Sequence, residues 1–148
     1  MSLVTVSATV QTHDPSHRGA MVMGFDQEKT RHHFVLYPDG GAIEVGVRDA
    51  ADTKERDAIR SHLPHIAAMF ADGNFDAPML VHDSNNVPGT QVMAAKKDAI
   101  QYRYSETSAG GQVSIFTTDA DALVAVHAFL RYQIAEHQTG DPTVPQKR

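Results

Sequence analysis

The sequence contains no cysteine and no tryptophan, and it has no long run of apolar residues. Without cysteine the chain has neither disulfides nor thiolate chemistry, so cysteine usage does not indicate a redox compartment. No run approaches the roughly 20 apolar residues that cross a bilayer, so we expect no contact with a membrane. No signal peptide is visible at the N-terminus. The cytoplasm is the default expectation, and export of a longer precursor stays open.

Clustered positive charge is also missing. The formal net charge is −5 with histidines neutral, and the only adjacent basic pairs are Lys96-Lys97 and Lys147-Arg148. Binding to nucleic acid through counterion release needs several clustered cations. We therefore expect no nucleic-acid partner.

The short motifs of the common enzyme classes are absent as well. The sequence has no Gly-x-Ser-x-Gly elbow, no phosphate loop, no Gly-x-Gly-x-x-Gly and no His-Glu-x-x-His. These absences disfavour the corresponding hydrolases, nucleotide-binding enzymes and zinc peptidases, and they leave other chemistry open.

What the 148 residues do contain is ordinary for a folded protein, with 41% hydrophobic and 21% charged residues. A chain of this length and composition predicts one domain with its own core. We place that domain at residues 1–138. Residues 139–148, with two prolines and a basic end, are expected to form a flexible C-terminal tail.

A pattern of elements occurs twice along the chain. Residues 32–47 and 102–117 each read as two β-prone runs, joined around Gly40-Gly41 and Gly110-Gly111. Positive φ angles are the expected reason for these glycines. Each hairpin is followed by a helical pattern. The sequence therefore predicts an α+β fold: an antiparallel sheet from two hairpin-helix units, with both helices on one face. Alternation over residues 4–10 predicts an extra N-terminal strand.

The helices carry clear start signals and apolar stripes. Asp52 opens the first helix, and Asp119 or Asp121 opens the last one. Pro64 predicts a kink in the first helix or its division in two. Residues 74–89 read as irregular, and residues 90–98 as a short helix. The two stripes are Ile59, Leu63, Ile66 and Phe70 in the first helix, and Leu123, Val126, His127, Leu130 and Ile134 in the last.

The two copies align without gaps over residues 32–49 and 102–119. A five-residue insertion in the first copy then aligns His62 with His127. This alignment suggests a shared, pseudo-symmetric histidine site. The alternative for His127 is a structural role, because its place near the centre of the stripe favours burial with its ring nitrogens bonded internally.

Nine histidines in 148 residues are the one compositional excess. His62, His65 and Met69 share one flank of the first helix. Imidazole suits Zn or Ni, and imidazole with thioether suits Cu, but a site needs one or two further ligands. His32 or His33 on the first hairpin and His82 in the following loop are candidates. The sequence thus predicts a metal site at His62, His65, His33 and His82.

Each histidine also has an ordinary explanation. A histidine at the boundary of an amphipathic helix packs its ring and exposes its edge. His32 and His33 point to opposite faces of their strand, and His32 shares the core face with Phe34 and Leu36. A second, weaker candidate for a soft metal is the segment that carries His13, His17, Met21 and Met23.

Several stretches resemble a family of small uncharacterised bacterial proteins over nearly the whole chain. They include Met23-Gly24-Phe25-Asp26, Thr30-Arg31-His32-His33-Phe34, His62-Leu63-Pro64-His65-Ile66-Ala67 and Phe129-Leu130-Arg131-Tyr132-Gln133-Ile134. The resemblance implies a folded bacterial protein. Some members carry an aspartate carbamoyltransferase label, but the Ser-Thr-Arg-Thr phosphate motif and the βαβ alternation of those enzymes are missing here.

Three functions remain open. The first is a module that binds a small ligand or a divalent metal through histidines. The second is a small hydrolase or lyase that uses a histidine with a carboxylate. The third is a non-catalytic homodimer, paired through the exposed edge of the first strand.

Overall fold

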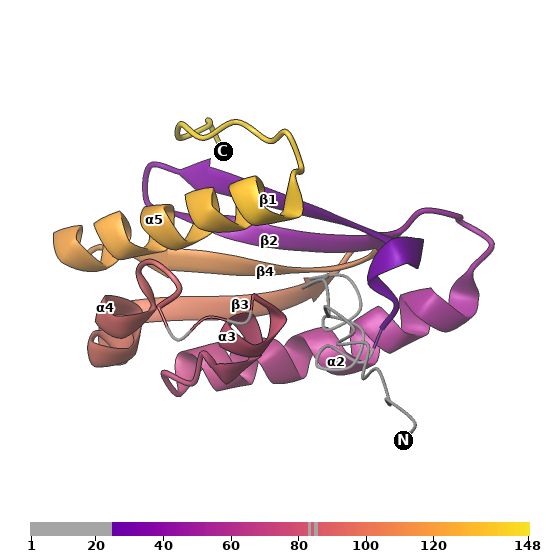
Figure 1. Ribbon diagram of the computed structural model, residues 1–148, viewed down its shortest axis with the longest axis horizontal. Coiled ribbons are helices and arrows are strands. Elements are labelled where there is room, and N and C mark those ends of the chain that lie inside the picture. Colours follow the sequence, from indigo (N-terminus) through magenta and orange to yellow (C-terminus); the bar gives the residue numbers. More distant parts are fainter. Residues whose placement is uncertain (1–24, 83, 85) are drawn as a thin grey trace, which may run out of the picture.

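The computed structural model describes residues 25–148 except 83 and 85, so the expected N-terminal strand and the segment with His13, His17, Met21 and Met23 lie outside the described residues. The fold is α+β. Two β-hairpins form one four-stranded antiparallel sheet, and each hairpin is followed by helices that pack on it (Figure 1). The elements are η1 (Gln27–Lys29), β1 (Thr30–Tyr37), β2 (Gly40–Val47), α2 (Thr53–Ala71), α3 (Asp76–Val81), α4 (Thr90–Ala95), η2 (Lys97–Ala99), β3 (Ile100–Glu106), β4 (Gly110–Thr117) and α5 (Ala120–His137).

The sheet has a symmetric strand order, β1-β2-β4-β3, with the second strand of each hairpin at the centre. β2 and β4 run antiparallel, and Ile43 pairs with Val113. These two residues are 70 apart, which is the spacing between the two copies of the hairpin pattern. A pseudo-two-fold axis therefore passes through the Ile43–Val113 pair.

The two hairpins also share one register. Thr30 pairs with Val47 in the first hairpin, and Ile100 pairs with Thr117 in the second. Adding 70 to the residue numbers of the first pair gives the second pair. The repeat seen in the sequence is therefore a repeat of backbone hydrogen bonding and not only of residue type.

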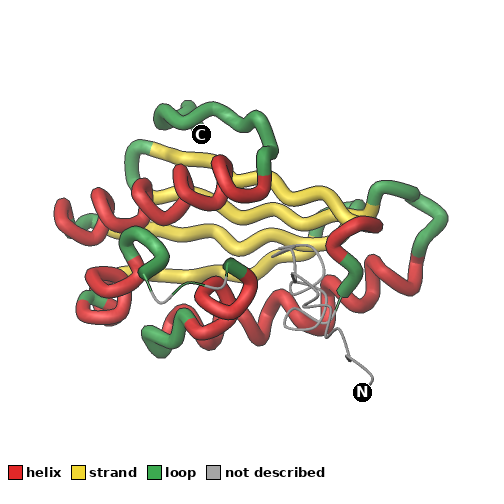
Figure 2. The backbone as a smooth tube through the Cα atoms, viewed as in Figure 1, coloured by secondary structure: helices red, strands yellow, loops and turns green. Residues whose placement is uncertain are grey.

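Each long helix packs on the hairpin of the other half. α2 follows the first hairpin but lies over β3 and β4, whereas α5 follows the second hairpin and lies over β1 and β2 (Figure 1). Figure 2 shows that the helices lie together on one face of the sheet. The core between the layers is apolar and includes the fully buried Leu36, Ile59, Leu63, Ile115, Val126 and Leu130.

One polar side chain from each long helix bonds the turn of the hairpin that the helix covers. His127 of α5 is buried, and its Nε2 lies 2.8 Å from the carbonyl oxygen of Tyr37 and 3.0 Å from that of Gly40, both at the turn of the first hairpin. Arg60 of α2 makes the same contacts with the other turn. Its guanidinium donates to the carbonyl oxygens of Thr107 (2.7 Å) and Gly110 (3.1 Å).

The counterpart of His127 is therefore Arg60, and the predicted alignment with His62 is wrong. Asp52 caps α2 and Asp119 caps α5, through bonds to the backbone N–H groups of Glu55 and Ala122. Arg60 and His127 each lie eight residues after their caps. The connection is thus three residues longer in the first half, not five. His62 lies on the exposed side of its helix.

Gly41 and Gly111, where β2 and β4 begin, serve the same close packing. A Cβ atom on Gly41 would lie 2.3 Å from Cδ1 of Leu130, and one on Gly111 would lie 3.3 Å from Cδ2 of Leu63. A positive φ is the predicted reason for all four hairpin glycines. It is confirmed for Gly40 (φ 153°) and is wrong for Gly41, Gly110 and Gly111. The glycines let the helices approach the sheet.

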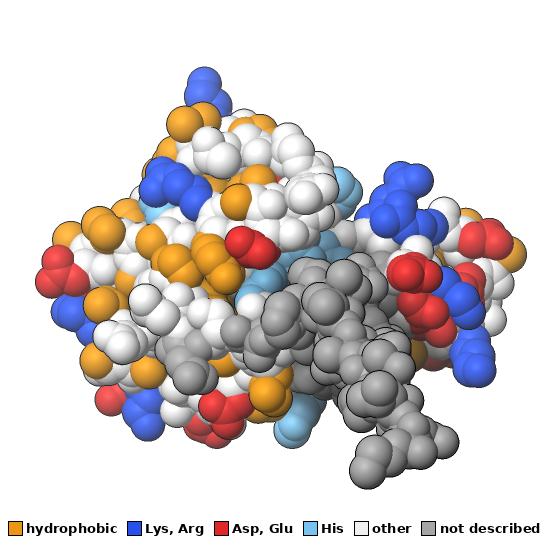
Figure 3. Space-filling view, viewed as in Figure 1, with side chains coloured by type: hydrophobic (Ala, Val, Ile, Leu, Met, Phe, Trp, Pro, Cys, Tyr) orange, Lys and Arg blue, Asp and Glu red, His pale blue; other side chains and the backbone are white. Residues whose placement is uncertain are grey.

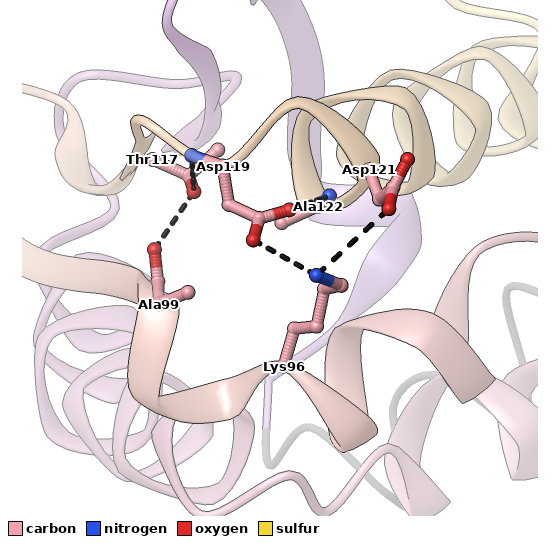
Figure 4. A network of polar contacts seen from close by, with 6 residues as sticks. All are labelled: Lys96, Ala99, Thr117, Asp119, Asp121 and Ala122. Carbon is pink, nitrogen blue, oxygen red and sulfur yellow. Dashed lines mark hydrogen bonds and ion pairs between the residues drawn. The ribbon is translucent and has the colours of Figure 1, made fainter.

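A polar network surrounds the start of α5 (Figure 4). Lys96 donates to the Asp119 carboxylate at 2.8 Å, and Asp121 lies at 3.9 Å. The hydrogen bond between these two side chains raises the pKa of Lys96 and lowers the pKa of Asp119. Thr117 Oγ1 donates to the carbonyl oxygen of Ala99 and accepts from the Asp119 N–H. The network ties α4 and β3 to the helix cap.

The middle of the chain can be compared with two predictions. Pro64 lies inside one continuous helix over Thr53–Ala71, so the predicted division in two is wrong, and the alternative of a kink stays a prediction. The segment predicted to be irregular contains α3, which has no side-chain cap and is only six residues long. Within the described residues, no helix has the length and apolar character needed to cross a membrane.

The C-terminal segment lies beside β1 at the edge of the sheet (Figures 1 and 2). The Asp141 carboxylate accepts from the Phe34 backbone N–H and lies 3.0 Å from His33 Nδ1, and the Gln146 N–H donates to the Leu36 carbonyl oxygen at 2.7 Å. These contacts occupy backbone groups of an edge strand. The flexibility predicted for residues 139–148 stays a prediction.

Candidate functional site

A cavity of about 60 Å³ lies between the sheet and helices α2, α3 and α5. Most of its lining is apolar, with Phe34, Ile66, Phe70 and Phe129 among the larger side chains. One side is polar, because His32, His82, Gln133 and His137 also line it. Histidine side chains reach the surface near the centre of the face shown in Figure 3.

The three histidines come from three elements and meet through their rings. His32 is on the core face of β1, His82 follows the last residue of α3, and His137 is the last residue of α5. The His32 and His137 rings stack with their centroids 5.3 Å apart and an angle of 11°. The His82 ring meets His137 nearly at right angles at 5.1 Å. The face predicted for His32 is confirmed.

Burial keeps two of these rings neutral. The pKa of His32 is lowered to about 3, mainly by burial, with smaller contributions from His137, Arg48 and His33. Burial lowers the pKa of His137 to about 4, with a smaller effect from His82. Two uncharged imidazoles can stack on one another without charge repulsion. At neutral pH each ring offers one donor and one acceptor.

The His82–Gln133 pair has unused hydrogen-bonding capacity. His82 Nε2 lies 2.8 Å from Gln133 Oε1. The other two polar atoms, His82 Nδ1 and Gln133 Nε2, are buried and have no partner among the described residues. If Nε2 of His82 donates, the free groups are a ring acceptor and an amide donor. If the Gln133 amide is turned round, they are a ring donor and an amide acceptor. Either way, the pair with a neutral His82 presents one donor and one acceptor.

The cavity can be compared with the equivalent position in the other half of the fold, which is formed by β3, β4 and α2. The pseudo-two-fold axis relates Gln133 to Ile66 and His137 to Phe70, because the helix positions differ by 67. It relates His32 to Tyr102, because the strand positions differ by 70. The stacked His32–His137 pair thus corresponds to an edge contact between Tyr102 and Phe70 at 6.0 Å. This position holds Ile66, Phe70 and Tyr102 in one half, and Gln133, His137 and His32 in the other. The buried hydroxyl of Tyr102 also has no partner among the described residues.

The four residues predicted to bind a metal are not gathered at this cavity. His62 and His65 are exposed on α2, and His33 is bonded to Asp141 on the surface. Only His82 lines the cavity. In the part of the chain that the structure describes, no group of three or more His, Asp or Glu side chains could hold a metal ion. A Zn, Ni or Cu site at these residues stays a prediction, which elemental analysis of protein purified without chelators would test.

Sequence reasoning missed Gln133 and His137. Both lie at the end of the α5 stripe, three and seven residues after Leu130, where an apolar side chain is expected. Their position could have indicated the site, because polar residues that continue a buried apolar stripe need hydrogen-bond partners.

Comparisons with models of protein families, with curated proteins and with solved structures give no match. The resemblance to a bacterial family therefore stays a prediction.

Proposed function

We propose that the protein is a binding module for a small ligand that has an apolar group and a polar head able both to donate and to accept a hydrogen bond. The observation that supports this function is the His82–Gln133 pair beside an apolar cavity. A buried donor or acceptor without a partner costs about 1–3 kcal/mol. A ligand head that bonds both free atoms would offset that cost.

The size of the cavity limits the apolar group. Its volume of about 60 Å³ is well below the roughly 150 Å³ of an engineered cavity that holds benzene. A short branched aliphatic group fits this space better than an aromatic ring does. The head would lie toward His82 and Gln133.

The comparison between the two halves supports a functional reading of the polar residues. Ile66, Phe70 and Tyr102 fill the corresponding place in the other half, where Ile66 and Phe70 are buried. The fold itself therefore does not require Gln133, His137 and His32. Their polarity is better explained by a ligand than by packing.

The other two readings have less support. An enzyme of the predicted type needs a histidine and a carboxylate in one pocket. In the described part of the chain, the histidine–carboxylate ion pair is His33–Asp141, and neither residue lines this cavity. The homodimer reading rests on an N-terminal strand outside the described residues.

Isovaleramide is a suitable first probe, because it joins a branched aliphatic group to a head that donates and accepts. We expect millimolar isovaleramide to shift the backbone NMR signals of residues around His82 and Gln133 in the labelled protein. Its N,N-dimethyl derivative, which lacks the donor, is expected to bind more weakly.

The matched variants copy the other half of the molecule. Gln133→Ile and His137→Phe are expected to stay folded, with an unchanged or higher melting temperature, and to lose the response to isovaleramide. Met69, which is half-buried on α2 outside the cavity lining, provides the control substitution Met69→Leu. Shifts that persist in Gln133→Ile, or that do not occur in the parent protein, would contradict the proposal.

A further inference from the structure

A second, polar recess adjoins the cavity and shares a wall with it. The recess has a volume of about 290 Å³ and is lined by residues of β1, by Arg48 just after β2, and by the end of α5 and the residues that follow it. His32 and His137 line both the recess and the cavity. The stacked pair of histidine rings therefore borders both an apolar space and a polar one.

Two arginines give the recess its positive charge. Arg31 and Arg48 both line it. Arg48 Nε donates to the Glu28 carbonyl oxygen, and neither guanidinium forms an ion pair with a carboxylate in the described part of the chain. The carboxylate beside this region, Asp141, already accepts from Phe34 and His33. Guanidinium groups without a carboxylate are the usual partners of anionic oxygen atoms.

The charge of Arg48 reaches the shared wall, since it contributes to the lowered pKa of His32. Both histidines of the wall are neutral at neutral pH, because burial lowers their pKa values to about 3 and about 4. These two rings therefore add no charge to the recess. His33, which also lines it, is paired with Asp141, and Arg31 and Arg48 are the lining cations without a carboxylate partner in the described part of the chain.

The comparison between the halves applies here as well. The positions of Arg31 and Arg48 correspond to Gln101 and Thr118, which carry no charge, because strand positions differ by 70. The arginine pair thus belongs to the half of the fold that is formed by β1, β2 and α5. The same half has His32, His137 and Gln133. Arg103 corresponds to His33, so not every cation of the sheet belongs to this half.

We infer that the ligand is a small organic acid, in which an amide or hydroxyl group lies between a short apolar group and a carboxylate. The apolar group occupies the cavity, the amide or hydroxyl bonds His82 and Gln133, and the carboxylate lies in the recess with Arg31 and Arg48. This inference rests on the proposed function, to which it adds the charge of the ligand and the residues that recognise it.

The test compares isovalerylglycine, which has all three groups, with its neutral counterpart isovalerylglycinamide. We expect the affinity for the acid to be at least about tenfold higher than the affinity for the amide, as measured by calorimetry or NMR titration. The double variant Arg31→Gln/Arg48→Thr, which copies the other half, is expected to remove this preference, so that the acid and the amide bind with similar affinity. Arg103→Gln removes one charge elsewhere on the sheet and is expected to keep the preference.

The outcomes separate the two proposals. If the acid and the amide bind equally well to the parent protein, the organic-acid inference is overturned and the binding module stands. The same conclusion follows if the arginine variant keeps the preference. If inorganic phosphate alone binds as well as isovalerylglycine and does not disturb the signals near Gln133, the recess is a general anion site and the inference fails. If none of these compounds binds and isovaleramide does not bind either, both proposals fall.

Discussion

The His32 and His137 rings stack in a place where a proton on either ring would be poorly solvated. Their pKa values, about 3 and about 4 in the folded protein, lie below the value of 6.5 for an exposed histidine. Between about pH 6.5 and pH 4, the unfolded chain therefore binds protons that the folded chain does not. Stability is fully present above about pH 6.5 and falls as the pH is lowered through this range.

We expect the two histidines together to steepen the acid loss of stability, by up to about 1.4 kcal/mol per pH unit for each ring. Urea unfolding between about pH 7 and pH 5 measures this slope. The double variant His32→Tyr/His137→Phe copies the other half and is expected to have a shallower slope. An equal slope in the parent and the variant would contradict the burial of these two bases.

His127 has a different, structural task. Its Nε2 contacts two carbonyl oxygens at the turn of the first hairpin. We expect His127→Leu to lower the free energy of unfolding by about 1–3 kcal/mol, because the leucine cannot bond these carbonyls. Arg60→Leu breaks the corresponding bonds of the other half. It is expected to cost less, because the Arg60 side chain is 24% exposed and water can replace it. The reverse order in chemical unfolding would show that the two contacts are not equivalent.

At the scale of elements, the second residues of β2 and β4 determine how closely the helices approach the sheet. A Cβ atom at Gly41 would lie 2.4 Å from the Val35 carbonyl oxygen, which is backbone and cannot move away alone. At Gly111 the nearest atom belongs to the Tyr104 ring, at 2.7 Å. We expect Gly41→Ala to destabilise the protein by about 3 kcal/mol and Gly111→Ala by about 1 kcal/mol.

Urea unfolding of these two variants, beside Gly140→Ala, measures the difference. Gly140 has a positive φ but no atom within 4 Å of its would-be Cβ, so its substitution reports the backbone strain alone. Equal costs at Gly41 and Gly111 would show that the strand start, rather than the atoms in contact, decides the outcome.

Much of this arrangement is predictable from the sequence, because local patterns set it. Alternation and turn residues predict the two hairpins, and the caps and stripes predict α2 and α5. The short α3 is missed, because six residues around Pro78 carry no side-chain cap. The candidate site is largely missed, because it depends on which helix lies over which hairpin. Single-sequence patterns place Gln133 and His137 on α5, but they do not place them opposite His32 and His82.

At the scale of the whole molecule, the C-terminal segment protects the open edge of the sheet. Asp141 and Gln146 bond backbone groups of β1, and the Arg148 guanidinium lies 4.4 Å from the centre of the Tyr37 ring. Unpaired edge strands favour association with other chains. We expect a chain ending at Gln138 to be less stable and to show a larger mass by light scattering. Val144→Ser, at a 61% exposed position, is the control and is expected to stay unchanged. An unchanged mass and stability of the shortened chain would contradict this role.

The exchange of helices between the hairpins has a further consequence. Neither hairpin is covered by its own helix, so neither half of the chain contains a complete core. A fragment with one half should be unfolded alone, whereas the two halves mixed together should recover the native structure, because the contacts that matter cross between them. A single half-length unit could satisfy the same contacts by pairing with a second copy of itself. The present chain thus has the geometry of a two-subunit assembly whose subunits have been joined end to end. Joining leaves the layer of β1, β2 and α5 free to acquire polar residues, while the layer of β3, β4 and α2 retains an apolar core.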